Sequence, residues 1–82
     1  MDVFEIGVSL KTDKVKLFVV PFEIQSFDST VGYLLVQNEV SLGSIYLGEN
    51  YRWTSSEILP WDDQDLQKIG KEIESLYFLF RD

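Results

Sequence analysis

The chain has 82 residues, a formal net charge of −7, and neither cysteine nor histidine. This length predicts one domain, residues 1–82. Without cysteine and histidine the chain lacks thiolate ligands, disulfides, thiol nucleophiles and the commonest general base. We therefore expect a protein that is not an enzyme, with no metal site and no bound cofactor.

The acidic charge also limits the partners that the chain can bind. Phosphate binding requires an array of cations, and no cluster of lysine or arginine stands out. Direct binding to nucleic acid or to an anionic membrane is therefore disfavoured, and a protein partner is favoured. The first residues, MDVFEIGV, lack a basic region followed by a long apolar run, and no apolar stretch approaches the roughly 20 residues of a membrane helix. We expect a cytoplasmic protein.

Five segments have the alternating apolar pattern, or the β-branched and aromatic content, of strands. They are residues 2–10, 15–24, 31–37, 40–47 and 51–55. The second segment becomes apolar on both faces between Phe18 and Val20. It then contains Pro21, which cannot donate a hydrogen bond to a ladder, so this strand should lie at an edge, be bulged or end there. Gly43, in the middle of the fourth segment, predicts a bulge or a close backbone approach.

The period of the apolar residues changes after residue 60. Steps of three and four, typical of one face of a helix, separate Leu66, Ile69, Ile73 and Leu76, and Phe80 follows. Strands followed by one helix predict an α+β fold, an antiparallel meander of four to five strands with a C-terminal helix packed on one face. Gly70 flanks the apolar face of the helix and predicts close contact with the sheet.

Three aspartates stand at the start of the predicted helix. Asp62 has the position of an N-cap, where its carboxylate accepts a backbone N–H, and Asp65 follows three residues later as in a weak capping box. Asp63 and Asp65 also lie near the positive end of the helix dipole. A calcium loop would require a glycine and a distal glutamate at fixed spacing, and both are missing. Helix capping is therefore preferred over a divalent-cation site.

Aromatic residues of the later strands are candidates for partner contacts. Tyr51 and Trp53 are two residues apart and should share one face of the last strand. If that face is the one left open by the helix, they form an exposed platform together with Tyr33 and Tyr46. The favoured interpretation is that these side chains complete the core, with their polar tips at its rim.

The C-terminal end of the helix, YFLF at residues 77–80, is apolar all round and adds Phe78 and Phe80 to the candidates. Together with the two-faced second strand, this favours a second layer on the open sheet face, most simply a second copy of the chain. The sequence therefore predicts a protein-interaction module that self-associates.

Two other functions remain open. One is an acidic inhibitor or antitoxin-like protein that masks a basic surface of a partner. Its first contacts would be acidic residues between Arg52 and Lys68, where the sequence has no base, namely Glu57, Asp62, Asp63 and Asp65. The other, less favoured, is a carrier that holds a small ligand on the aromatic face.

Overall fold

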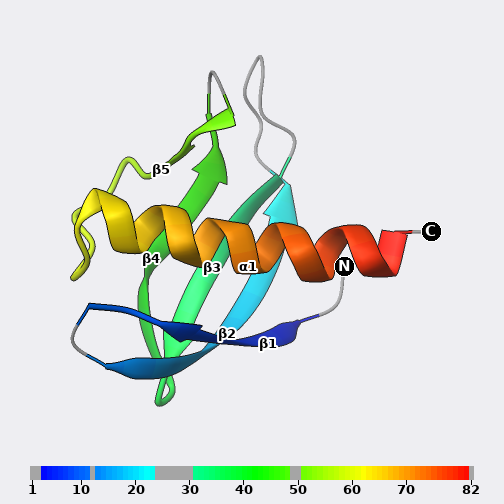
Figure 1. Cartoon of the computed structure of the whole chain (residues 1–82). Coiled ribbons are helices and arrows are strands. Elements are labelled where there is room, and N and C mark those ends of the chain that lie inside the picture. Colours follow the sequence, from blue (N-terminus) through cyan, green and yellow to red (C-terminus); the bar gives the residue numbers. More distant parts are fainter. Residues whose placement is uncertain (1–2, 12, 24–30, 49–50, 82) are drawn as a thin grey trace.

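The computed structural model describes residues 3–11, 13–23, 31–48 and 51–81, except for the side chains of residues 77–81. Five strands and one helix follow in order: β1 Phe4–Ser9, β2 Lys14–Glu23, β3 Val31–Gln37, β4 Val40–Leu47, β5 Trp53–Thr54 and α1 Asp63–Arg81. The strands form one antiparallel sheet in the order β1-β2-β3-β4-β5, and α1 lies across one face of it (Figure 1). The predicted α+β meander with a C-terminal helix is confirmed.

The core lies between α1 and the covered face of the sheet. Alternate strand residues and one face of the helix supply its buried apolar side chains, which are Ile6, Val8, Leu10, Leu17, Val19, Tyr33, Leu35, Ile45, Trp53, Ile69 and Ile73. Full burial of one aliphatic side chain contributes about 1.5–3 kcal/mol, so this layer is the main source of stability. Within the part of the chain that the structure describes, no helix has the length and apolar content needed to cross a membrane.

The two irregular positions in the strands have separate explanations. β2 continues through Pro21, which is paired with Tyr33 of β3, whereas the described ladder with β1 ends where Val19 faces Phe4. Among the described residues Pro21 therefore has a paired strand on one side only, an edge position that tolerates its missing N–H. The bulge predicted at Gly43 is confirmed, because the β3–β4 register shifts beside it and its φ is 141°.

The last strand is shorter than predicted. Only Trp53 and Thr54 pair with β4, and Tyr51 has a left-handed φ of 58° with its side chain 86% exposed. Because this left-handed residue breaks the alternation, Tyr51 does not lie on the same face as the buried Trp53. The prediction that the two aromatics share a face was wrong. A hairpin turn joins β3 and β4, with the positive φ at both Asn38 and Glu39 that a type I′ turn requires.

Candidate functional site

The first helical turn is organised by Asp62. Its Oδ1 accepts the backbone N–H of Asp65 at 2.9 Å, and its backbone C=O accepts the N–H of Leu66 at 3.0 Å, so the predicted N-cap is confirmed. The other carboxylate oxygen forms an ion pair with the Lys11 amine. The hydrogen bond from the Lys11 amine is the main cause that lowers the pKa of the Asp62 carboxyl, and the Asp65 N–H and the charge of Lys11 lower it further. The same hydrogen bond and the charge of Asp62 raise the pKa of the Lys11 amine.

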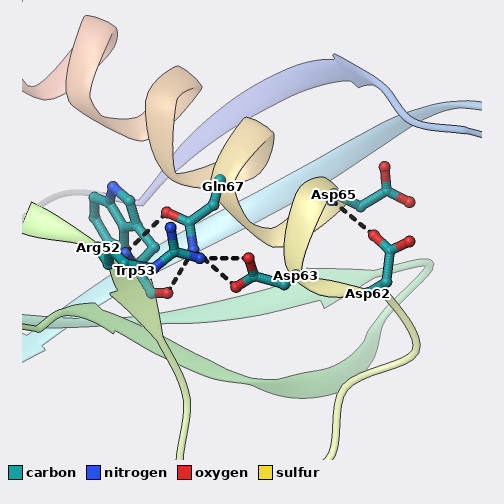
Figure 2. A network of polar contacts seen from close by, with 6 residues as sticks. All are labelled: Arg52, Trp53, Asp62, Asp63, Asp65 and Gln67. Atoms are coloured by element: carbon teal, nitrogen blue, oxygen red, sulfur yellow. Dashed lines mark hydrogen bonds and ion pairs between the residues drawn. The ribbon is translucent and has the colours of Figure 1, made fainter.

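The two other aspartates also bind groups of their own chain. Asp65 is buried, and its Oδ1 accepts the backbone N–H of Lys11 at 3.3 Å, which ties the β1–β2 turn to the helix. That contact differs from the capping box expected for Asp65. Asp63 forms an ion pair with Arg52 and accepts the Gln67 amide at 3.2 Å (Figure 2). Among the described residues no group of three or more acidic, histidine or cysteine side chains is placed to hold a metal ion.

Gln67 completes the outer edge of β5, a role that the sequence analysis missed. Its Oε1 accepts the Trp53 N–H at 3.0 Å and its Nε2 donates to the Trp53 C=O at 2.7 Å, so one side-chain amide binds both backbone groups as a further strand would (Figure 2). The Trp53 indole N–H donates to Glu74 Oε1 at 2.9 Å. Residue 70 lies between these contacts, and a Cβ there would collide with the Trp53 ring, which confirms the close helix–sheet contact predicted at Gly70.

Trp53 and Tyr33 are buried, so neither residue belongs to an exposed aromatic platform. Both rings lie in the core, with their centroids 5.5 Å apart and an interplanar angle of 57°. The favoured interpretation, that these aromatics complete the core, is therefore correct for Tyr33 and Trp53. Gln67, Gly70 and Glu74 are three and four residues apart, so they share one face of the helix. This spacing was the feature of the sequence that could have indicated their common contact with Trp53.

The edge of β4 is covered by the segment that follows β5. The Ser44 N–H donates to Glu57 Oε2 at 2.6 Å, and the Ser55 hydroxyl donates to the Ser44 C=O at 2.6 Å. The Glu57 N–H in turn donates to the Ser55 hydroxyl at 3.0 Å. Glu57, a candidate contact for a basic partner, is thus engaged in sealing an edge strand.

The opposite face of the sheet carries apolar side chains, and no helix of the described residues covers it. On β2 the alternation that buries Leu17 and Val19 turns the intervening residues away from α1. We call this surface the open face; its apolar members are Phe18, Val20, Phe22, Leu34, Val36 and Tyr46. Phe18 is 49% and Phe22 is 39% exposed. The register places Phe18 beside Val36, Val20 beside Leu34 and Phe22 beside Gly32.

A groove of about 390 Å³ crosses one end of the open face. It is lined by Glu5, Lys16, Phe18, Val20, Val36, Asn38 and Glu39. Of the predicted aromatic candidates whose side chains the structure describes, only Tyr46 lies on the open face, where it is half-buried. Tyr51 is exposed next to β5, and the side chains of Phe78 and Phe80 lie outside the described residues. The two-faced apolar centre of β2 was visible in the sequence, but Phe18 and Phe22 were not predicted as partner contacts.

No protein-family model matches the chain, and no curated protein or solved structure matches it significantly.

Proposed function

We propose that the chain is a non-enzymatic protein-interaction module that self-associates through the open face. The exposure of Phe18 and Phe22 on an apolar sheet surface is the observation that supports this function most. An antiparallel sheet leaves one face in water readily when that face is polar, but the centre of β2 and β3 is apolar on both faces. Contiguous apolar surface of this kind marks protein contacts.

The acidic alternative has less support from the contacts of its residues. Asp62 and Asp63 are paired with Lys11 and Arg52, while Asp65 and Glu57 accept backbone N–H groups of the chain itself. A basic partner would have to compete with these contacts. The location proposed for the module is the cytoplasm, for which the cysteine-free composition is suited.

Sedimentation equilibrium across micromolar concentrations tests the proposal. We expect the wild-type chain to form dimers, and Phe18→Thr and Phe22→Thr to shift the population toward monomer, because each removes an exposed ring and replaces it with a β-branched residue that favours a strand. Val40→Thr is the matched control, since Val40 is exposed on the sheet but outside the open face, and it should leave the association unchanged. A wild-type monomer of 9.5 kDa at every concentration would refute self-association.

A further inference from the structure

In the β2–β3 ladder, open-face residues of the two strands lie side by side in pairs. From Phe18 to Phe22, each outward residue of β2 is paired with an outward residue of β3: Phe18 with Val36, Val20 with Leu34, and Phe22 with Gly32. Beyond Phe18 the two strands lead to Lys16 on β2 and to Glu39 in the β3–β4 turn, and both line the groove. The two strands thus carry an aromatic against a smaller residue at two positions. At one end the continued register puts Lys16 opposite Asn38, and the adjoining Glu39 lines the same groove as Lys16.

In a symmetric dimer, the same residue pairs can contact each other between the two copies. In a two-fold interface, if one residue contacts a second residue of the other copy, the reverse contact also forms. An axis that runs between two facing sheets, parallel to β2 and β3 and midway between them, therefore brings each β2 residue to its own ladder partner on the other copy. The twist of packed sheets, about −30°, leaves the contacts nearest this axis in place.

We propose that the partner on the open face is a second copy in this arrangement, an inference that rests on the proposed self-association. Phe18 then contacts Val36 of the second copy, and Phe22 comes to the position of Gly32, which has no side chain. Lys16 comes opposite Asn38 of the second copy and contacts the adjoining Glu39, which lines the same groove, and Glu39 contacts Lys16 in return. The interface consists of an apolar centre closed at one end by two identical ion pairs.

The charges favour this axis over one that runs across the strands. Two copies with a net charge of −7 each repel, so a symmetric interface requires opposite charges to face each other locally. An axis that crosses the strands at Val20 brings Phe18 to Phe22 and, among the described residues, leaves Glu39 without a facing cation. Among the described residues Lys16 and Glu39 form no ion pair within the chain, so both are available to the second copy.

Charge exchange tests the arrangement. Lys16→Glu alone and Glu39→Lys alone each place like charges together twice in the dimer, and each should weaken self-association by about fivefold to tenfold, as expected for two exposed contacts. The double variant Lys16→Glu/Glu39→Lys should recover wild-type association. An equimolar mixture of the two single variants should also recover it, because both contacts of the mixed dimer are again of opposite charge.

The controls and outcomes separate this inference from the proposed function. Lys68→Glu and Glu72→Lys make the same changes in net charge on exposed helix positions and should leave association near the wild-type value. If the wild type dimerises but the mixture of single variants stays as weak as either alone, this axis is refuted and self-association stands. If the double variant recovers while the mixture does not, the contact lies within one chain and the arrangement is also refuted. A wild-type monomer refutes both proposals.

Discussion

Asp62 combines a backbone cap with an ion pair, and its charge has a defined pH dependence. Its pKa is lowered below the ordinary value, so the stabilisation is fully present above that value and is lost as the pH falls through the folded-state pKa. The pKa of Lys11 is raised, so the stabilisation that the Lys11 charge contributes is fully present below the ordinary lysine pKa and is lost as the pH rises through the folded-state pKa.

We expect Asp62→Asn, which keeps a cap acceptor without the charge, to lower the denaturation midpoint at neutral pH by less than Asp62→Ala does. The wild type and Asp62→Asn should converge at acid pH, where the wild-type carboxyl is protonated. Urea unfolding at a series of pH values measures both effects, with the exposed Glu72→Gln as control. If the denaturation midpoint of Asp62→Asn falls with acid pH as much as that of the wild type does, the Asp62 charge does not contribute to the loss of stability in acid.

Divalent cations test whether Asp62, Asp63 and Asp65 form a metal site. Each carboxylate already binds a cation or an N–H of the chain. A ligand raises the melting temperature only through preferential binding to the folded state, so millimolar calcium or magnesium should leave it unchanged. A saturable rise that Asp63→Asn abolishes would contradict the assignment of these residues to helix and turn contacts.

Gly70 shows that a packing contact outweighs helix propensity. Alanine is favoured over glycine inside a helix by about 1 kcal/mol, but at position 70 the added Cβ would collide with the Trp53 ring. We expect Gly70→Ala to lower the free energy of unfolding by on the order of 1–2 kcal/mol, the difference between overpacking and the gain in propensity. Ser75→Ala, at an exposed position of the same helix, should be neutral or stabilising. Equal stability of both variants would mean that the ring moves freely.

At the scale of elements, side chains close the edge formed by β4 and β5. The Gln67 amide binds the backbone of β5, and Ser55 with Glu57 binds the backbone of β4. These contacts occupy groups that would otherwise pair with another strand, so they both stabilise the fold and oppose edge-to-edge association.

Gln67→Ala leaves the N–H and C=O of the buried Trp53 without their partner, and we expect a loss of about 1–3 kcal/mol in the free energy of unfolding. Gln64→Ala is the matched control, because Gln64 is an exposed residue of the same helical turn. Chemical denaturation monitored by tryptophan fluorescence reports the difference. If the two alanine variants unfold at the same midpoint, the amide does not hold β5.

The order of strands and helix could be predicted because each element has a clear local period. The alternation of Ile6 and Val8 and the helical steps from Ile69 to Ile73 depend only on neighbours along the chain. The placement of Trp53 and the contacts of Gln67 could not be predicted, because they depend on which strand meets which turn of the helix. The open face was only partly predictable: the two-faced centre of β2 was visible, but its neighbours follow from the register with β3.

At the scale of the whole molecule, the net charge and the open face act in opposite directions on association. Two copies of charge −7 repel over a distance that salt reduces, from about 10 Å at 0.1 M to about 3 Å at 1 M. In the proposed dimer, burial of the rings of Phe18 and Phe22 would not be screened by salt, whereas the exposed Lys16–Glu39 contacts would contribute at most about 1 kcal/mol each.

We therefore expect the dissociation constant of the dimer to stay level or to fall as sodium chloride is raised from about 0.1 M to about 1 M. An interaction of the acidic surface with a basic partner would weaken over the same range, because its attraction is screened. Sedimentation equilibrium at several salt concentrations measures this, and Phe18→Thr provides the control that lacks part of the apolar contact. A wild-type dimer that dissociates at high salt would mean that charged groups, rather than the open face, hold the two copies together.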